Sequence, residues 1–404
     1  MVRSVVVKLG GSVLRDVEAI GEAAGWVKRM AGKGVGVVVV VSALKGVTDE
    51  LQRTARNLSS NPDPELMAEI LSMGERTSAR LFALALREHG VNAMFIEPAS
   101  RLWPIIAEGD PLNAEPIYEE TKRRCAESIL PLLDAGITPV VCGFLGVTRD
   151  GKVVTLGRGG SDTTAVLLGS CLGSEEIVLV KDVPGVMSGD PDQVGEAEVI
   201  DVLDFREAQA LVKGGAKIIH TKALRYLGKG LRLRIASLKE LVTGGGTVIE
   251  GYERELEVSV DSTRVGMITV VGDGARMPEI LNVITDRLSE QGVRILASAS
   301  EENSVILYVE EAESLARKLH ATLIGNGAGK AISIYGGLSM ITVSGRMLET
   351  SPGVIYRIVR PLAEAGINVY GLLTISSSIR VFVSRAETER ARKLIKGALE
   401  EVRA

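Results

Sequence analysis

The chain has 404 residues, of which 46% are hydrophobic and 24% are charged, and its formal net charge at pH 7 is −4. This length exceeds what a single hydrophobic core usually organises, so we expect two or three domains. Charges of both signs are mixed along the chain without a basic block or an acidic tail, which excludes the usual signature of a nucleic-acid-binding protein.

The cysteines and the apolar runs narrow the class of protein further. Cys125, Cys142 and Cys171 lie far apart and lack the spacing of metal ligands, so we interpret them as buried, reduced thiols. The longest apolar runs are too short to cross a bilayer. We therefore expect a soluble, cytoplasmic protein with no membrane partner and no protein-held metal.

The first element is a β-branched run at Ser4–Val7, which predicts a buried strand leading through Lys8 into Gly10, Gly11 and Ser12. A strand that ends in glycines can present backbone N–H groups to an anion, so this turn is a candidate phosphate loop. It is not the GxxxxGK[ST] motif, because Lys8 precedes the glycines. Taken alone, a tight turn with a surface lysine is the favoured alternative.

The next elements alternate between helix and strand. A helix is predicted over Ala19–Ala31 and a valine-rich strand over Val35–Val41, followed by a loop of small residues, Ser42–Thr48. A long helix begins near Glu65, and we expect Gly74 to interrupt it just before a glutamate. Its core face is formed by residues at helical spacing: Ala79, Phe82, Ala83 and Leu86.

The segment GRGGSD, Gly157–Asp162, is the most informative part of the chain. It follows a strand and opens a predicted helix, Thr163–Cys171, so its backbone N–H groups can face an anion. The guanidinium of Arg158 adds donors suited to a carboxylate or a phosphate. Ser161 and Asp162 are also good N-cap residues, which is the structural alternative. We favour the anion site, because a plain capped helix needs no arginine between glycines.

Later elements continue the alternation to about Leu241. Glu176–Val180 is a buried strand, Tyr118–Ala135 and Asp204–Val212 are helices, and Gly214–Lys217 is expected to start another helix. Strands that alternate with helices predict a parallel sheet covered on both faces.

After a candidate linker at Gly244–Gly246 the pattern changes. Two βαββα units of similar length follow, from Met267 to His320 and from Met340 to Leu399, and each is of ferredoxin-like type. We expect domains at 1–246, 247–338 and 339–404, with an opening segment of the second domain that the third can share.

Several motifs together resemble the aspartate kinases of the amino acid kinase family, which carry two C-terminal ACT domains. They are VVVKLGGSVL (5–14), VVVVSALKGVTDEL (38–51), MGERTSARL (73–81), GFLGVTRDGKVVTLGRGGSDTTA (143–165), KDVPGV (181–186), GAKIIHTKAL (215–224) and ITVSGRMLETSPGVIYRIVRPLAEAGINVYGLLTIS (341–376). The resemblance covers nearly the whole chain. It implies an α/β fold, with a parallel-rich three-layer kinase domain followed by two ferredoxin-like ACT domains.

The resemblance also implies a reaction. The enzyme would transfer the γ-phosphoryl group of ATP, with Mg²⁺, to the side-chain carboxylate of L-aspartate. The product would be 4-phospho-L-aspartate, the first intermediate towards lysine, threonine and methionine. Phosphoryl transfer needs positioning and charge neutralisation, and a carboxylate acceptor is already ionised, so no general base is required. The three histidines, His89, His220 and His320, are therefore interpreted as structural.

Residue roles follow from the matched motifs. Lys8 would stabilise the transferring phosphoryl group, and Asp162 would orient Lys8 or, with equal weight, cap the helix. Arg158 would bind the α-carboxylate of aspartate and Glu75 its α-ammonium. Further substrate contacts are assigned to Ser42, Thr48 and Ser161, and nucleotide contacts to Gly10, Gly11, Ser12, Asp182, Gly185, Asp190 and Lys217.

The chain departs from the family pattern at Lys181, Met187 and Asp192, so the details of nucleotide binding are open. In the second repeat, Ser351, Gly353 and Val354 at a helix start and Asn368 and Val369 entering a strand are candidate effector residues. Lysine or threonine would be the effector, and ACT units would pair to form a homodimer or a larger homo-oligomer.

Two other functions remain to be separated from this one. The first is a kinase with another carboxylate or carbamate acceptor, which the pairing of Glu75 with Arg158 argues against. The second is a catalytically silent amino acid sensor, which the presence of Lys8, Asp162 and Lys217 argues against.

Overall fold

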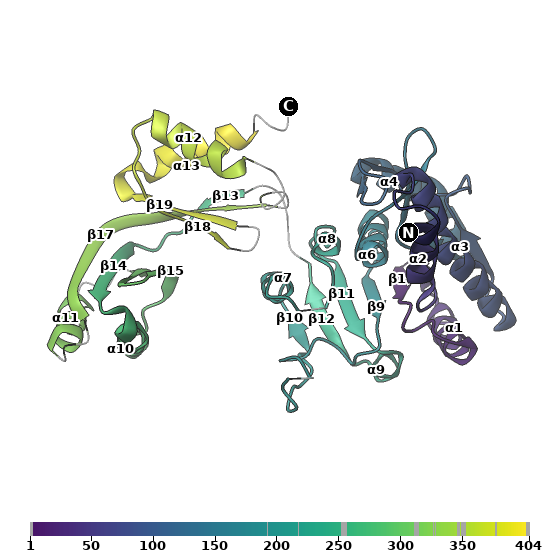
Figure 1. Cartoon of the computed structure of the whole chain (residues 1–404), viewed down its shortest axis with the longest axis horizontal. Coiled ribbons are helices and arrows are strands. Elements are labelled where there is room, and N and C mark those ends of the chain that lie inside the picture. The colour runs from purple at the N-terminus through teal and green to yellow at the C-terminus, as the bar shows by residue number, and fades with distance from the viewer. Residues whose placement is uncertain are drawn as a thin grey trace. The chain divides into compact units, whose positions relative to one another are not determined.

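The computed structural model describes residues 3–191, 193–216, 218–251, 257–310, 315–325, 327, 329–345, 348, 353–375 and 378–400. The chain forms two compact units, Met1–Glu253 and Arg254–Ala404, and each is built on its own sheet (Figure 1). Within the described residues, no helix combines the length and apolar character that crossing a membrane requires.

The described part of the first unit contains an eight-stranded sheet in the order β10-β12-β11-β9-β1-β2-β6-β3. Neighbouring strands run parallel, except for the antiparallel pair β11–β12. Central strands are buried on both faces, which explains their nearly continuous Val, Ile and Leu composition. The strands are β1 (Ser4–Leu9), β2 (Gly36–Val41), β3 (Ala93–Ile96), β6 (Thr138–Cys142), β9 (Glu176–Val180), β10 (Val202–Leu203), β11 (Arg232–Ala236) and β12 (Thr247–Glu250).

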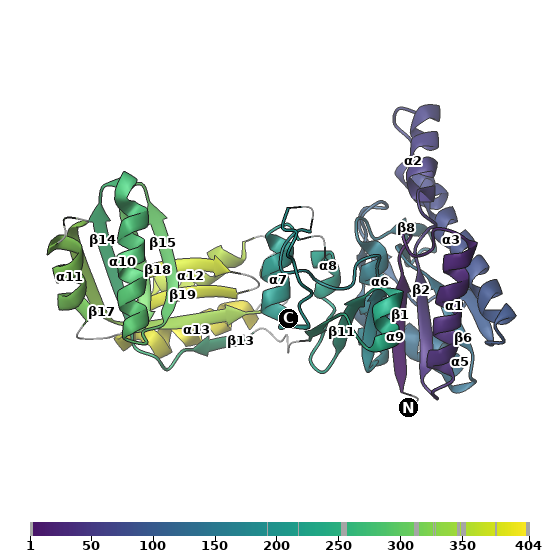
Figure 2. The same cartoon turned by 90° about the horizontal axis from the view of Figure 1, so that it is seen from below.

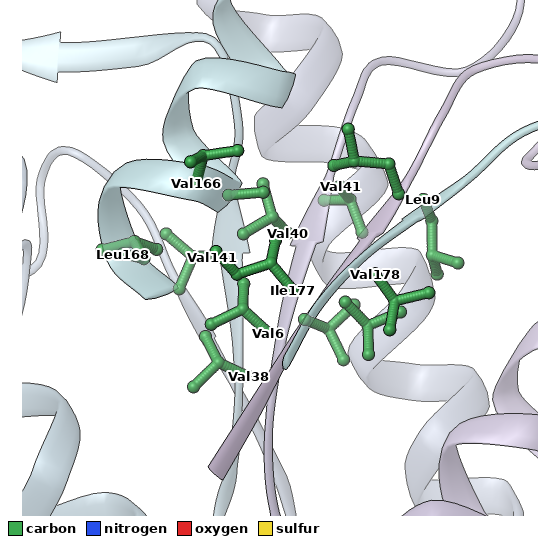
Figure 3. Packing of buried hydrophobic residues seen from close by; sticks show 14 of the residues in the cluster. Val6, Leu9, Val38, Val40, Val41, Val141, Val166, Leu168, Ile177 and Val178 are labelled. Atoms are coloured by element: carbon green, nitrogen blue, oxygen red, sulfur yellow. The ribbon is translucent and has the colours of Figure 1, made fainter. Parts of the chain in front are cut away.

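Helices cover this sheet, with α6 packed on β1, β2 and β9 and with α1 and α3 packed on β2 from the other side (Figure 2). Figure 3 shows Val166 and Leu168 of α6 beside Val6, Val141 and Ile177 of the strands. The helices are α1 (Val17–Ala31), α2 (Val47–Leu58), α3 (Pro64–Glu88), α4 (Tyr118–Arg124), α5 (Leu130–Asp134), α6 (Gly160–Leu172), α7 (Phe205–Lys213), α8 (Thr221–Leu224) and α9 (Leu238–Thr243). Two small hairpins lie beside the sheet, β4 (Ala107–Glu108) with β5 (Glu115–Pro116), and β7 (Leu145–Val147) with β8 (Val153–Thr155).

The alternation predicted from sequence is confirmed, with four local corrections. The predicted helix over Tyr118–Ala135 contains a π-helical turn at Cys125–Ile129 between α4 and α5. Helix α6 begins at Gly160, three residues before the predicted start. Gly74 does not interrupt α3, because the helix is continuous through it. The helix predicted to start within 214–217 begins only at Thr221, where the ring nitrogen of the preceding histidine accepts a backbone N–H and caps it.

The second unit has an antiparallel sheet in the order β15-β16-β14-β17-β19-β18, with β13 also paired to β17. The predicted order βαββα occurs twice and is confirmed. The elements are β13 (Glu257–Val260), β14 (Val265–Gly272), α10 (Met277–Glu290), β15 (Ile295–Glu301), β16 (Ser304–Glu310), α11 (Leu315–Gly325), β17 (Gly329–Ser344), α12 (Val354–Glu364), β18 (Val369–Ile375), β19 (Ser378–Ser384) and α13 (Thr388–Glu400).

The long strand β17 joins the two repeats. Its first part pairs with β14, and its last seven residues, Leu338–Ser344, pair with β19. Gly337 has φ 74°, and the pairing with β14 shifts register just beside it, so the strand carries a bulge there. The expected boundary between residues 338 and 339 therefore falls inside a single strand. Strand β13 pairs with the later part of β17, as expected for a segment shared with the second repeat.

The first unit also extends beyond the expected boundary at residue 246. Gly244–Gly246 forms the turn between α9 and β12, and β12 completes the sheet of the first unit. The hydroxyl of Thr247 is buried and accepts the N–H of Val186 at 2.7 Å. These glycines therefore form an internal turn, and the first unit continues to Glu253.

Candidate active site

The carboxyl ends of β1, β2, β6 and β9 meet at one edge of the sheet, because these four strands are parallel neighbours. A cavity of about 280 Å³ opens there. Every residue predicted to contact aspartate lines it, together with the predicted phosphoryl residues. The lining consists of Lys8, Ser42, Thr48, Glu75, Phe144, Gly157, Arg158, Gly159, Gly160, Ser161 and Asp162.

Lys8 and Asp162 form an ion pair on one side of the cavity. The ammonium of Lys8, near the end of β1, lies 2.8 Å from Oδ1 of Asp162 in the first turn of α6. Lys181, directly after β9, lies 3.6 Å from Oδ2 of the same carboxylate. Burial raises the pKa of Asp162, but the charges of Lys8 and Lys181 outweigh it, so the pKa lies below its ordinary value. Asp162 is therefore a carboxylate at neutral pH.

The N-cap interpretation of Asp162 is wrong. The N-cap residue of α6 is Gly159, and no side chain caps this helix. Gly159 has φ 71°, and a Cβ there would lie 2.2 Å from the Cβ of His220, so only glycine fits. Among the described residues, the N–H groups of Ser161 and Asp162 have no protein partner. The helix start therefore leaves donors free for an anion at the cavity.

The first glycine turn lies beside the same ion pair. A Cβ at Gly10 would be 3.3 Å from the ammonium of Lys8. In the described part of the chain, the N–H groups of Gly11 and Ser12 also lack a protein partner. Two turns from distant parts of the sequence thus bring free N–H donors close to Lys8. This favours the phosphate-loop interpretation over a turn with a surface lysine, since the side chain of Lys8 is only 10% exposed.

Glu75, on α3, also lines the cavity. Its Oε1 accepts the N–H of Ala43 at 3.0 Å, whereas Oε2 is buried without a partner in the described residues. Burial raises the pKa of Glu75 to about 7, against the opposing effect of the Ala43 N–H. A buried carboxylate oxygen with no donor is costly, so the site is suited to a cationic ligand group.

The cavity lining also contains an arginine. Arg158 is exposed at the cavity, and within the described ranges its guanidinium has no acidic partner. Ser42, Thr48 and Ser161 add hydroxyl groups to the lining. One cavity therefore offers a free cation, a buried carboxyl group that ionises near neutral pH and neutral donors, which is the set that a zwitterionic amino acid requires.

Sequence reasoning missed two residues of the site. Phe144 lines the cavity with φ 67°, a conformation that bulky residues avoid, and its N–H donates to Thr164 Oγ1 at 3.1 Å. No sequence pattern marks this backbone conformation. Lys181 was noted only as a departure from the family pattern. Its position directly after a buried parallel strand was the available signal, because such strand ends share one edge of the sheet.

The predicted nucleotide residues are not part of this cavity lining, neither Gly10, Gly11 and Ser12 after β1 nor Asp182, Gly185 and Asp190 after β9. Gly185 is buried against Thr247 of β12, and Asp182 and Asp190 are exposed. Met187, one of the departures, forms an isolated bridge with Val199. Lys217 and Asp192 lie outside the described residues.

The predicted effector residues fall at two places in the second unit. Gly353 is the N-cap of α12, with φ 81°, and Val354 is the buried first residue of that helix. Asn368 is exposed just before β18, which begins at Val369. Ser351 lies outside the described residues.

Comparisons with known proteins agree over most of the chain. The model of the amino acid kinase family matches residues 3–237, and an ACT domain model matches residues 333–396. The aspartokinase of Geobacillus stearothermophilus is 31% identical over 378 residues, which cover 90% of this chain and 89% of the relative. That of Thermus thermophilus is 26% identical over 410 residues, 98% of each chain.

Solved structures share the fold. The aspartate kinase from Synechocystis aligns with a TM-score of 0.74 at 25% identity, covering 98% of this chain and 69% of that chain. Aspartokinase III of E. coli, in complex with aspartate and ADP, aligns with a TM-score of 0.55 at 23% identity over 98% of this chain and 100% of that chain.

Proposed function

The chain belongs to the amino acid kinase family and to its aspartate kinases, and we propose that it converts L-aspartate and ATP into 4-phospho-L-aspartate and ADP. The observation that carries the proposal is the cavity itself. It places Glu75 and Arg158, suited to the two charges of an amino acid, beside the Lys8–Asp162 pair and its free N–H groups.

The chemical step is a displacement at the γ-phosphorus. An oxygen of the substrate's side-chain carboxylate forms a bond to that phosphorus, and the bond from phosphorus to the oxygen bridging to the β-phosphate breaks. The electron pair of the broken bond leaves with ADP. No proton moves, because the acceptor carboxylate is ionised at neutral pH. The enzyme therefore contributes positioning and charge stabilisation.

On the phosphate side, Lys8 meets the negative charge of the transferring group, and Asp162 holds the ammonium of Lys8 in place. The free N–H groups of Gly11, Ser12 and Ser161 add neutral donors that need no reorganisation during the reaction. These groups come from the turn after β1 and from the start of α6.

On the acceptor side, Glu75 binds the α-ammonium through its unpartnered Oε2, and Arg158 binds the α-carboxylate with its planar fork of donors. Ser42, Thr48 and Ser161 donate hydrogen bonds to the substrate. The side-chain carboxylate of aspartate is then the group left to face Lys8.

Mg²⁺ enters as part of the Mg·ATP substrate. Among the described residues, no group of three or more His, Cys, Asp or Glu side chains is gathered as a metal cage. The ion would keep several waters and be held chiefly by phosphate oxygens. Bound there, it would neutralise part of the phosphate charge.

The second unit is proposed as the regulatory part, with lysine or threonine as effector and ACT pairing as the route to a homo-oligomer. The product would enter the synthesis of lysine, threonine and methionine. The repeated βαββα units and the ACT match over residues 333–396 support this proposal.

The test is an ADP-release assay over a panel of acceptors, with hydroxylamine to trap an acyl phosphate as the hydroxamate. The panel is L-aspartate, L-glutamate, N-acetyl-L-glutamate and carbamate. We expect hydroxamate from L-aspartate, and a Glu75→Gln variant with a raised KM for aspartate but an almost unchanged KM for ATP. Faster turnover of another acceptor would overturn the substrate assignment. Absence of turnover with every acceptor would overturn the proposed kinase activity.

A further inference from the structure

Lys181 does not line the cavity itself, but it forms an ion pair with Asp162, which does. It follows β9, which is the parallel neighbour of β1, so its side chain emerges at the same sheet edge as that of Lys8. Its N–H donates to the carbonyl of Ala236 at 2.9 Å, which fixes the backbone at the end of β11. The position of Lys181 is therefore set by two neighbouring strands.

The side chains of Lys8, Asp162 and Lys181 form a triad with unequal charge. Each lysine lies near a different oxygen of the Asp162 carboxylate, at 2.8 Å and 3.6 Å. Two ammonium groups share one carboxylate, so the triad carries one uncompensated positive charge. Lys8 and Asp162 are each 10% exposed and Lys181 is 20% exposed, so water screens this charge only in part.

We propose that Lys181 is a second cation of the phosphoryl-transfer site. A Lys8–Asp162 pair alone would be neutral and would meet the phosphates of ATP with little net attraction. By drawing on the same carboxylate, Lys181 leaves the ammonium of Lys8 less neutralised, and it adds its own charge beside the β- and γ-phosphates. This inference rests on the proposed function and extends it to a residue that the matched motifs do not assign.

The positive charge of Lys181 can stabilise the negative charge that moves during phosphoryl transfer. As the acceptor oxygen bonds to the γ-phosphorus and the bond to the β,γ-bridging oxygen breaks, negative charge moves onto that bridging oxygen and into ADP. A fixed cation on the phosphate side stabilises this redistribution more than it stabilises bound aspartate. Lys181 should therefore affect kcat and nucleotide affinity, and leave the KM for aspartate almost unchanged.

A purely structural role, in which Lys181 only ties β9 to α6, makes a different prediction. In that case, substituting Lys181 would lower the Tm and raise the KM for both substrates. It would weaken the binding of ADP and of adenosine alike. A role in charge stabilisation distinguishes them, because adenosine lacks phosphates.

The experiment compares Lys181→Met, Lys181→Arg and the wild-type enzyme, with Lys152→Met as the matched control. Lys152 is also a lysine paired with carboxylates, but it is half-exposed and its partners are Glu65 and Asp150, whereas Lys181 pairs with Asp162. For Lys181→Met we expect kcat to fall about 10- to 100-fold, on the scale of losing one charge-stabilising group. We expect ADP binding by calorimetry to weaken and adenosine binding to stay unchanged. Lys181→Arg should restore most of both losses.

Two results would overturn the inference while leaving the proposed function intact. One is a Lys181→Met enzyme with kcat and ADP affinity within twofold of the wild type. The other is a Lys181→Met enzyme in which the loss of activity accompanies a lowered Tm and is not restored by Lys181→Arg. In that enzyme the binding of adenosine would be weakened as much as the binding of ADP. By contrast, a wild-type enzyme that forms no hydroxamate from aspartate would overturn the proposed function itself.

Discussion

Glu75 is a residue of the cavity whose charge changes near neutral pH. Its pKa is raised to about 7 by burial, so below that pH it is largely protonated and cannot attract the α-ammonium of aspartate. We predict that the KM for aspartate falls as the pH rises from 6 to 8, while the KM for ATP changes little. Initial rates across this range will show it. In Glu75→Gln this pH dependence should disappear, and its persistence would assign the titration to another group.

Glu75 should also make the free energy of unfolding smaller at high pH. The folded-state pKa of Glu75, about 7, exceeds the ordinary 4.5, so the folded chain binds more protons than the unfolded chain between these values. The free energy of unfolding therefore decreases as the pH rises through this window. We predict that Glu75→Gln gains stability relative to wild type between pH 4.5 and 8, by about 3 kcal/mol. Urea denaturation of both proteins at pH 4.5 and at pH 8 measures their free energies of unfolding. If the variant and the wild type differed by the same amount at both pH values, the prediction would be wrong.

Arg158 provides the test of substrate orientation. Arg158→Lys keeps the charge but loses the planar fork that binds a carboxylate through two hydrogen bonds. We predict that the KM for aspartate rises about tenfold, which corresponds to losing one charge-assisted hydrogen bond. The KM for ATP should barely move. Steady-state kinetics with each substrate varied in turn will decide, and a rise confined to the KM for ATP would make Arg158 a phosphate residue.

Among the elements, helix α3 and the loop after β2 fit together through Gly74. A Cβ at Gly74 would lie 2.7 Å from the Cβ of Ala43, the residue whose N–H holds Glu75. We predict that Gly74→Ala pushes the loop away, raises the KM for aspartate and costs about 1–3 kcal/mol of stability through overpacking. The double variant Ala43→Gly/Gly74→Ala removes the clash and should recover most of the lost affinity. If it does not, the defect lies in the helix and not in this contact.

Strand-end loops could be predicted from the sequence because apolar runs followed by glycines are local patterns. Parallel strands bring such loops to one edge, as they do for Lys8 near the end of β1 and Ser42 after β2. Glu75 lies in a helix and Arg158 follows a small hairpin, so only the resemblance grouped them with Lys8, and all of these residues line one cavity. What could not be predicted depends on tertiary neighbours. The contact of Lys181 with Asp162 depends on strand order, and the φ of Phe144 depends on the helix packed beside it. Gly244–Gly246 looked like a linker because composition does not show which strand pairs with which.

At the scale of the whole chain, the two units allow a test of regulation by truncation. A chain ending at Glu253 keeps β12, whereas one ending at Gly246 loses it together with the buried Thr247 and Ile249. We predict that the longer fragment unfolds cooperatively and that the shorter one is strongly destabilised. Circular dichroism melts of the two fragments measure this directly. Equal melting temperatures would mean that β12 contributes little to the first unit.

The longer fragment also tests the proposed effector. Lysine and threonine are titrated against the intact enzyme and against residues 1–253, with activity and Tm as readouts. We predict inhibition and a thermal shift only in the intact chain, because an effector acts by binding two conformations unequally. If the intact chain responds to neither amino acid, the regulatory proposal fails and the second unit is left as an assembly module.

Strand β17 contributes side chains to two hydrophobic cores, and the bulge at Gly337 determines which of its residues face the helices in each half. Ile332 packs with the core beneath α10 and α11, whereas Ile341 and Val343 pack with the core beneath α12 and α13. Along a regular strand, even- and odd-numbered side chains point to opposite faces. One extra residue at the bulge inverts this alternation, so each half of β17 offers the correct face to its own helices. A single-residue deletion at Gly337 would therefore reverse the face of half a strand, and the cost would fall on an entire repeat and not on one contact.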